Sequence, residues 1–270
     1  MRTFTRQEIC ERLRTKIGKR EALLFGSAGI GLTAKMQERA GIDLILTYCA
    51  CAYRMDAIPT ATSLLAYADC NEVTMELGRR ILTIVQNTPV IAGIGAADPY
   101  RDHAKLIDNL IERGFSGIIN APSIGEYDSL FRSESDNSQI GYPQEIALIS
   151  TCRKKDVFSI AFAFSPDDAS AMAGAGADVV CAHIGPSTQE AMSIDEASAL
   201  LGAMREAVRK ENADTLVIGH GGPLVTPEAV RQCLLNADLH GFLGSSVFET
   251  APIRAGVSQI VKEFEMLRPR

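Results

Sequence analysis

The feature that most constrains the fold of this chain is a series of eight short apolar stretches, which carry few charges and do not alternate between polar and apolar residues. Such stretches are typical of parallel strands that are covered on both faces. We therefore expect eight strands, at residues 22–25, 44–47, 90–94, 117–119, 158–162, 179–182, 216–218 and 241–243.

The segments between these stretches have the signals of amphipathic helices. A residue that can cap a helix, followed by proline or by glutamate three residues later, stands at Thr5, Ser165, Ser193 and Thr226. The last two helices are expected to begin near Thr226 and Pro252. Eight β–α repeats after one extra N-terminal helix predict an α/β fold, a single (β/α)₈ TIM barrel that spans residues 1–270.

The alternative is an open, doubly wound sheet in which residues 26–31 form a dinucleotide-binding loop. The glycines of this loop do not have the G-x-G-x-x-G spacing. The next strand ends in Thr47-Tyr48-Cys49, without the acidic residue that binds a ribose. We therefore favour a tight turn of a barrel and expect no nucleotide cofactor.

The charge and the cysteine content exclude several classes of protein. A net charge of -6 argues against nonspecific nucleic-acid binding, which needs a basic surface. No apolar stretch is long enough to cross a membrane, and the first residues lack the apolar segment that a signal peptide would have. The seven cysteines form no CxxC pair and no disulfide framework. These features predict a cytoplasmic protein that binds neither membrane nor nucleic acid.

The barrel hypothesis places the functional residues at the carboxyl-terminal ends of the strands. Those ends supply Ser27, Tyr48, Asn120, His183 and His220. A single histidine in such a place is more often structural than functional. Two histidines at equivalent positions favour a functional role for at least one of them, because an imidazole can act as a general acid or base.

The last two strands are followed by glycine-rich segments. Gly221 and Gly222 follow His220, and Gly244-Ser245-Ser246 follows the eighth strand. Glycine lets backbone N–H groups approach a ligand, and serine adds hydroxyl donors, so these segments predict a site for a phosphate or carboxylate. The alternative is that both segments are simply tight turns of the barrel.

Two long connections, residues 49–69 and 121–141, also follow strands and are expected to be binding loops or lids. The first contains Arg54, which could clamp an anion. Asp69, Asp98 and Glu249 are the carboxylates expected at the mouth, although Asp69 could instead cap a helix and Asp98 could begin a turn. Because these acids are far apart in the sequence, they permit a Mg²⁺ site without indicating one.

Several segments together carry a resemblance to a known family. They are GSAGIGLTA at 26–34, YRM at 53–55, LLAYADCN at 64–71, ADPYR at 97–101, HGGP at 220–223 and residues 241–249. Through them the sequence resembles the phosphoenolpyruvate hydrolase-like TIM-barrel family, also described as phosphonopyruvate hydrolases. The same barrel forms the C-terminal domain of the plant inhibitor of tobamovirus RNA replication.

The resemblance implies a barrel of the phosphoenolpyruvate/pyruvate class. Members of that class cleave or rearrange C–C, C–O or P–C bonds of oxo-acids, commonly use Mg²⁺ and assemble as dimers or larger oligomers. The sequence departs from the class where its metal-binding members carry paired acids, because here only Asp98 follows the third strand.

We expect a hydrolase or lyase that acts on a small anionic oxo-acid such as phosphonopyruvate or phosphoenolpyruvate. In this hypothesis Ser245, Ser246 and the neighbouring backbone hold the anion, Arg54 closes over it, and His183 or His220 is the acid or base. Asp69 and Asp98 would orient a water molecule or a Mg²⁺ ion. The alternative is a catalytically silent barrel that binds a small ligand or takes part in protein interaction and signalling. In either case the resemblance implies a homo-oligomer.

Overall fold

Eight parallel strands pair in chain order and close into a barrel in the computed structural model, which describes residues 2–187 and 192–267. The barrel closes where Leu23 of the first strand pairs with Gly241 of the last. This closure confirms the predicted TIM barrel and excludes the open sheet. The strands are β1 Leu23–Ser27, β2 Leu44–Thr47, β3 Val90–Gly93, β4 Gly117–Ile119, β5 Phe158–Ala163, β6 Val179–His183, β7 Leu216–His220 and β8 Gly241–Leu243.

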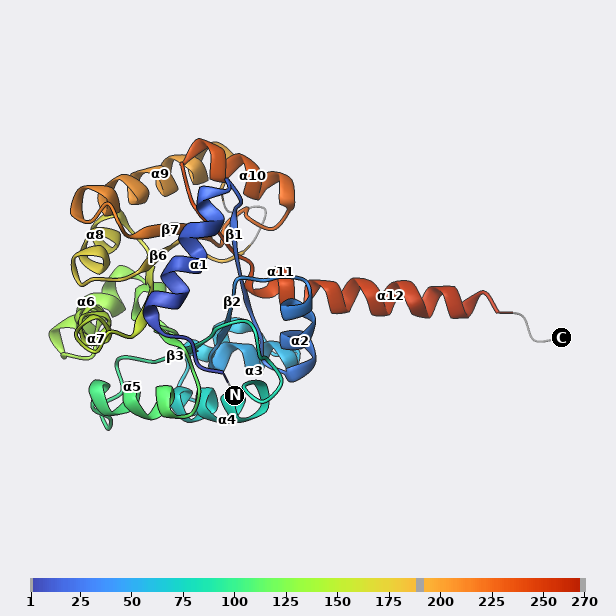
Figure 1. Cartoon of the computed structure of the whole chain (residues 1–270), viewed down its shortest axis with the longest axis horizontal. Helices are drawn as coiled ribbons and strands as arrows, with labels where there is room; N and C mark the ends of the chain where they lie inside the picture. Colours follow the sequence, from blue (N-terminus) through green and yellow to red (C-terminus); the bar gives the residue numbers. More distant parts are fainter. Residues whose placement is uncertain (1, 188–191, 268–270) are drawn as a thin grey trace.

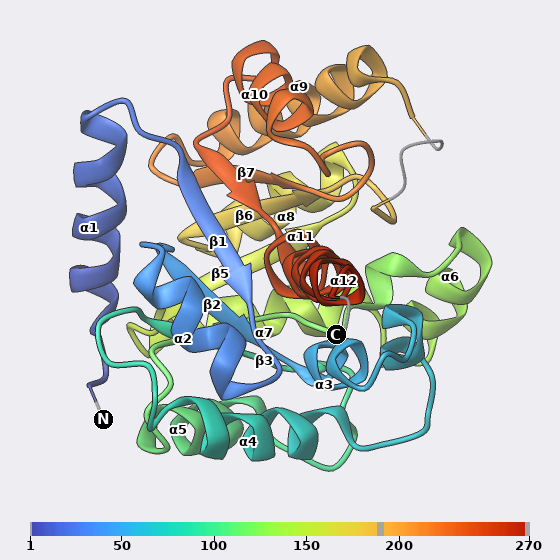
Figure 2. The same cartoon turned by 90° about the vertical axis from the view of Figure 1, so that its right-hand side faces the viewer.

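Helices surround the barrel on its outside (Figures 1 and 2). The extra N-terminal helix is present and precedes the first strand, as predicted. The helices are α1 Arg6–Gly18, α2 Gly31–Arg39, α3 Cys49–Met55, α4 Cys70–Ile81, α5 His103–Glu112, α6 Ser129–Asn137, α7 Tyr142–Lys154, α8 Pro166–Gly174, α9 Ile194–Glu211, α10 Pro227–Asn236, α11 Ser245–Glu249 and α12 Ala251–Glu265, with short 3-10 helices η1 Thr60–Leu64 and η2 Ile124–Glu126.

The predicted caps begin four of these helices. The side chains of Ser165 and Thr226 accept hydrogen bonds from the backbone at the starts of α8 and α10. Thr5 and Ser193 each form a complete capping box with the glutamate three residues later. Each cap satisfies amides that have no partner inside the helix, which explains why the helices begin at these residues.

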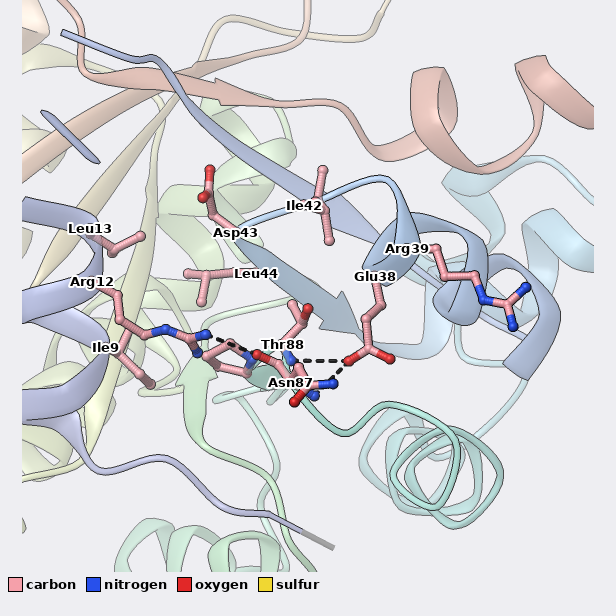
Figure 3. Close-up of a pocket in the computed structure, with 12 residues that line it drawn as sticks. Ile9, Arg12, Leu13, Glu38, Arg39, Ile42, Asp43, Leu44, Asn87 and Thr88 are labelled. Carbon is pink, nitrogen blue, oxygen red and sulfur yellow. Dashed lines mark hydrogen bonds between the residues drawn. The ribbon is translucent and has the colours of Figure 1, made fainter. Parts of the chain in front are cut away.

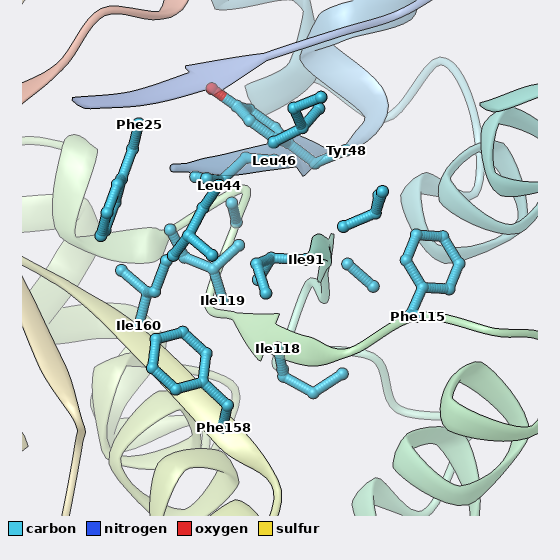
Figure 4. Close-up of a cluster of buried hydrophobic side chains, with 14 of the residues drawn as sticks. Phe25, Leu44, Leu46, Tyr48, Ile91, Phe115, Ile118, Ile119, Phe158 and Ile160 are labelled. Carbon is cyan, nitrogen blue, oxygen red and sulfur yellow. The ribbon is translucent and has the colours of Figure 1, made fainter. Parts of the chain in front are cut away.

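The barrel interior and the layer under the helices are packed with apolar side chains (Figure 4). Phe25, Leu44, Ile91, Ile119 and Ile160 are completely buried. This packing requires small residues where strands come close. A Cβ atom at Gly241 would lie 2.2 Å from the carbonyl oxygen of Leu23, so the closing pair β1–β8 needs glycine here.

The structure corrects the prediction for the connections on the carboxyl-terminal side of the barrel. The two expected loops contain helices, namely α3 and η1 in the first and η2 and α6 in the second. Asp128 caps α6 by accepting a hydrogen bond from the amide of Phe131. The expected turn at Gly244-Ser245-Ser246 is the start of helix α11, because Gly244 donates its amide to Phe25 in β1 and the chain then turns directly into the helix.

The last helix, α12, begins near Pro252 as predicted, but it does not cover the barrel. It projects away from the other elements (Figure 1), and none of its residues is buried. Within the described residues, no helix combines the length and the apolar character that crossing a membrane requires.

Candidate functional site

A cavity of about 640 Å³ opens at the carboxyl-terminal ends of the strands. The ends of β5, β6 and β7 contribute to its lining, together with segments that follow β2, β4, β5, β6 and β8. TIM barrels carry their chemistry at this end, so this mouth cavity is the candidate site. Six predicted residues line it, namely Tyr48, Arg54, His183, His220, Ser245 and Ser246.

The two histidines lie side by side in the mouth cavity. They pair in register at the ends of β6 and β7, and their ring centroids are 4.8 Å apart. The Nδ1 atom of His183 accepts a hydrogen bond from the amide of Gly185, and the Nδ1 atom of His220 lies 2.8 Å from the carbonyl oxygen of Leu243. Because a carbonyl only accepts, neutral His220 is protonated on Nδ1 and keeps a lone pair on Nε2. Neutral His183 has the opposite tautomer, with its proton on Nε2.

Burial keeps both imidazoles neutral. It lowers the pKa of His220 to about 4, and it lowers the pKa of His183 well below the ordinary value, with His220 adding to the effect. The rings of Phe162 and Phe164 pack against His183, with centroids 5.4 and 5.1 Å away. This apolar wall disfavours the charged form of the imidazole.

Asn120 was expected to face the mouth, but its side chain is fully buried and is not part of the cavity lining. Its Oδ1 accepts from the amide of Phe162 at 2.7 Å, and its Nδ2 donates to the carbonyl of Phe162 and to Glu145, at 3.2 and 2.5 Å. Asn120 therefore fixes the backbone of Phe162, whose ring contacts His183. Asn120 therefore positions a residue of the cavity wall without lining the cavity itself.

Glu145, which the sequence analysis missed, is the carboxyl group at the end of this network. It lies on α7, is fully buried, and accepts hydrogen bonds from Ser123 and from the amide of Ile124, both at 2.7 Å. Burial outweighs these bonds and raises its pKa to about 8. A signal was present in the sequence, because Glu145 lies on the same helix face as Tyr142 and Ile149, and a carboxyl group within an apolar stripe is unusual.

The raised pKa of Glu145 predicts a pH-dependent stability. The folded protein keeps the proton up to about pH 8, whereas the unfolded chain releases it near the ordinary glutamate pKa of 4.5. The raised pKa of Glu145 therefore contributes fully to the free energy of unfolding below about pH 4.5. This contribution, on the order of a few kcal/mol, is lost as the pH rises to about 8.

Glu145→Gln removes this ionisation. We expect the difference in unfolding free energy between wild type and variant to favour wild type more at pH 5 than at pH 8.5, as measured by urea denaturation. A difference that stays constant across this range would contradict the assignment.

Arg54 is not the mobile clamp that was expected. It lies on α3, and its Nε donates to Glu249 at 2.6 Å while its Nη2 donates to Ser27 at 2.9 Å. Glu249 also accepts the amide of Gly29 at 2.6 Å. Ser27 and Glu249 are therefore held in a buried network outside the cavity lining, and Gly29 has no free amide for an anion. Arg54 is still one of the residues that line the cavity.

The glycines after β7 and β8 do not reach the cavity. Gly221 has a φ of 85°, and a Cβ atom there would lie 2.1 Å from the carbonyl oxygen of Gly185. Gly222 donates its amide to the same carbonyl. Gly244 donates to the neighbouring strand. Gly221 and Gly222 make a tight turn that packs two loops together, and Gly244 is the residue at which α11 begins, so these three residues do not form the expected backbone anion site.

Asp69 and Asp98 lie together, but in a neighbouring cavity of about 460 Å³. Arg101 binds Asp69 at 2.6 Å and also pairs with Asp98 and Glu72. Asp69 caps α4, and Asp98 accepts the amide of Tyr100, as the alternative interpretations of these two residues proposed. The two acids are therefore separated from the histidines, and together with Glu72 they share one guanidinium group.

This arrangement does not fit a Mg²⁺ ion. Magnesium needs oxygen ligands that are free to coordinate it. Here Arg101 bonds one oxygen of Asp69 and one of Asp98, and backbone amides bond the other oxygen of each. Among the described residues, no group of three His, Cys, Asp or Glu side chains is placed to hold a metal ion. We therefore assign no metal ligands.

Glu126 is a further cavity residue that the sequence analysis did not select. It is the last residue of η2 and carries the one carboxyl group among the described residues that line the cavity. The residue as a whole is exposed, yet the surrounding protein desolvates its carboxyl group and raises its pKa to about 7. It is therefore partly protonated at neutral pH, unlike the two histidines.

A polar cavity of about 540 Å³ at the opposite end of the barrel is not a second site (Figure 3). Two of its charged groups, Arg12 and Glu38, bind the backbone of the chain itself. Arg12 donates to the carbonyl of Asn87, and Glu38 accepts the amides of Gln86, Asn87 and Thr88. These bonds fix the segment before β3, so the cavity is part of the framework.

A family model described as phosphoenolpyruvate hydrolase-like matches residues 8–267. The tomato (Solanum lycopersicum) ToMV susceptible protein tm-1(GCR26) is 32% identical over 266 residues, which are 96% of this chain and 35% of that protein. This chain thus spans about a third of that relative's length.

Two solved structures share the fold. The structure of phosphonopyruvate hydrolase in complex with oxalate and Mg²⁺ matches this chain with a TM-score of 0.60 at 16% sequence identity. The match covers 95% of this chain and 86% of the hydrolase chain. The structure of oxaloacetate acetylhydrolase in complex with the product oxalate matches with a TM-score of 0.60 at 17% sequence identity. That match covers 97% of this chain and 89% of the acetylhydrolase chain. At these identities the likeness is evidence for the fold alone.

Proposed function

We propose that this chain, which belongs to the phosphoenolpyruvate hydrolase-like family, hydrolyses a small anionic oxo-acid of the phosphonopyruvate type in the mouth cavity. One observation carries the proposal. Two neutral imidazoles with opposite tautomers lie against an aromatic wall, in a cavity whose described lining contains one cationic side chain, Arg54. A hydrogen-bond donor, an acceptor and the guanidinium group of Arg54, which is paired with the buried Glu249, thus meet at one place.

The substrate carboxylate would be held at the β8 side of the cavity. Arg54 offers the positive charge, and the hydroxyls of Ser245, Ser246 and Tyr48 offer hydrogen bonds. The hydroxyl of Tyr48 lies 3.5 Å from that of Ser245, so the two donors are adjacent. Charge-assisted hydrogen bonds of this kind fix orientation as well as affinity.

The histidines and Glu126 would handle the protons. A water molecule attacks phosphorus, the P–C bond breaks, and its electron pair passes into the enolate of pyruvate. The Nε2 lone pair of His220 takes a proton from the water, and the Nε2–H of His183 donates to the enolate oxygen. Glu126, whose pKa is raised to about 7, delivers a proton to C3. The products are phosphate and pyruvate, and solvent returns the proton from His220 to Glu126.

The test is to incubate the purified protein with phosphonopyruvate, phosphoenolpyruvate or oxaloacetate and to measure phosphate, pyruvate and oxalate. We expect phosphate and pyruvate from phosphonopyruvate. If the protein converts none of these substrates, with or without Mg²⁺, the proposed reaction is wrong.

A second candidate is a silent barrel that binds an oxo-acid without converting it. It is favoured by the pairing of Asp69 and Asp98 with Arg101, which leaves these acids unavailable to chemistry. A ligand that binds only the native state raises the melting temperature whether or not it reacts. Stabilisation by oxalate or pyruvate without any product would therefore favour this candidate.

A further inference from the structure

We propose that Cys49 and Cys70 form an oxidation site, at which hydrogen peroxide joins their two sulfurs into a reversible disulfide. Cys49 is the first residue of α3, and Cys70 is the first residue of α4. The two helices contact each other, and both cysteines are free thiols in this structure. Neither cysteine lines the mouth cavity, so the inference does not depend on the proposed reaction.

The two thiols are in direct contact. The thiol of Cys49 donates a hydrogen bond to the sulfur of Cys70, and this bond raises the pKa of Cys49 and lowers that of Cys70. The backbone of Gly95 makes room for the contact, because a Cβ atom there would lie 2.5 Å from the Sγ atom of Cys70. Two sulfurs that already share a hydrogen bond can be joined with a small movement of their side chains.

Cys70 is the cysteine that reacts with the oxidant. It is half-buried and lines the neighbouring cavity of about 460 Å³, so a molecule as small as a peroxide can reach it from solvent. The thiol of Cys49 and the amide of Gly95 both donate to its sulfur, at the positive end of α4. These donors favour the thiolate, which is the nucleophilic form, and they outweigh burial and the negative charges of Asp69 and Asp98, which raise the pKa of Cys70.

The five other cysteines do not combine exposure with a favoured thiolate. Cys10 is also half-buried, but burial and the carboxylate of Asp178 raise its pKa to about 11. Because peroxide reacts with thiolates, Cys10 has the accessibility of Cys70 without its nucleophilic form. The remaining four are buried, namely Cys51, Cys152, Cys181 and Cys233.

Hydrogen peroxide supplies the oxidising equivalents for the reaction. The thiolate of Cys70 attacks one peroxide oxygen, the O–O bond breaks, and the products are a sulfenic acid and hydroxide. The hydroxide takes the proton of Cys49, whose sulfur then attacks the sulfur of Cys70 and displaces a second hydroxide. That hydroxide takes up the proton that Cys70 released, so two thiols and one peroxide give one disulfide and two water molecules. A dithiol returns both cysteines to thiols by exchange.

The disulfide fixes one wall of the mouth cavity. It closes a covalent loop over residues 49–70, which contains α3 and η1. Arg54 of α3 and Thr60 and Leu64 of η1 line the mouth cavity. A crosslink that closes a loop restricts the unfolded chain and opposes local opening of the segment inside it. Oxidation therefore stabilises the fold and makes this wall of the mouth more rigid.

The test is to treat the reduced protein with hydrogen peroxide, alkylate the remaining thiols, and digest it with trypsin for mass spectrometry without reduction. Trypsin separates residues 40–54 from residues 55–79, and the second peptide contains Cys70 as its single cysteine. We expect the two peptides to be joined with the loss of two hydrogen atoms and to separate after dithiothreitol. The oxidised protein should melt roughly 5–10 °C higher than the reduced one, and its amides in residues 49–70 should exchange more slowly.

Variants identify the two sulfurs. Cys49→Ser and Cys70→Ser should each abolish the crosslink and the rise in melting temperature, while circular dichroism shows that the reduced proteins are folded. Cys51→Ser, which changes the other cysteine of peptide 40–54, and Cys10→Ser, which changes the other half-buried cysteine, are the matched controls and should keep both effects.

Each other result overturns the proposal. If peroxide oxidises Cys70 to a sulfinic acid without a crosslink, Cys49 is not its partner. A crosslink that survives Cys49→Ser but is lost in Cys51→Ser would assign the disulfide to Cys51. If peroxide modifies Cys10 before Cys70, the contact with Cys49 does not favour the thiolate. A crosslink that leaves the melting temperature and the amide exchange unchanged would show that it does not fix the wall of the mouth.

Discussion

Replacing Arg54 by methionine is expected to lower the free energy of unfolding by about 3–5 kcal/mol, because it leaves Glu249 buried without its cation. Glu249 is fully buried, and burial already raises its pKa. The remaining amide of Gly29 and hydroxyl of Ser27 do not neutralise the charge. For a chain of this size the loss corresponds to a fall in melting temperature of roughly 10 °C.

The pH dependence identifies the cause. Without Arg54, Glu249 takes up a proton more readily. The loss of unfolding free energy in Arg54→Met relative to wild type should therefore shrink as the pH is lowered from 8 to 5. Arg54→Met/Glu249→Gln removes the unpaired charge but keeps an oxygen for Gly29, and it should recover a large part of the loss. Arg80→Met breaks an exposed pair with Glu76 and should cost less than about 1 kcal/mol.

All variants are compared by circular dichroism melts at one protein concentration, since association also affects the melting temperature. A deficit of Arg54→Met as small as that of Arg80→Met would mean that the buried pair does not hold α3, β1 and α11 together.

The sequence was sufficient for the barrel because the strands are covered on both faces and therefore contain no charged residue and few polar ones. It also predicted the histidine pair, since residues that end adjacent parallel strands become neighbours, as the register of His183 with His220 confirms. These features depend on local pattern and on the symmetry of the fold.

The partners of charged groups could not be predicted in this way. Arg54 and Glu249 are 195 residues apart, and only the tertiary structure brings them together. The same holds for Arg101, which joins Asp69 to Asp98 and removes both from the mouth. Helix α11 was missed because five residues are too few for a periodic pattern.

His220→Asn is expected to lower kcat by about 10²–10⁴-fold if His220 is the general base of the proposed reaction. The amide of asparagine can replace the Nδ1–H donor to the carbonyl of Leu243, but it has no counterpart of the Nε2 lone pair. The fold should therefore be retained while the base is lost. His103→Gln, at a histidine outside the cavity that bonds the carbonyl of Ala96, is the control and should keep wild-type activity.

The pH profile of the wild type separates catalysis from a structural effect. A base with the pKa of His220 must be deprotonated, so kcat/KM should rise as the pH increases through about 4. An acid with the pKa of Glu126 must be protonated, so kcat/KM should fall above about 7. Glu126→Gln should remove the alkaline limb. A profile centred on the ordinary histidine pKa, or full activity of His220→Asn, would show that the chemistry uses other groups, because neither result is compatible with a buried neutral imidazole acting as the base.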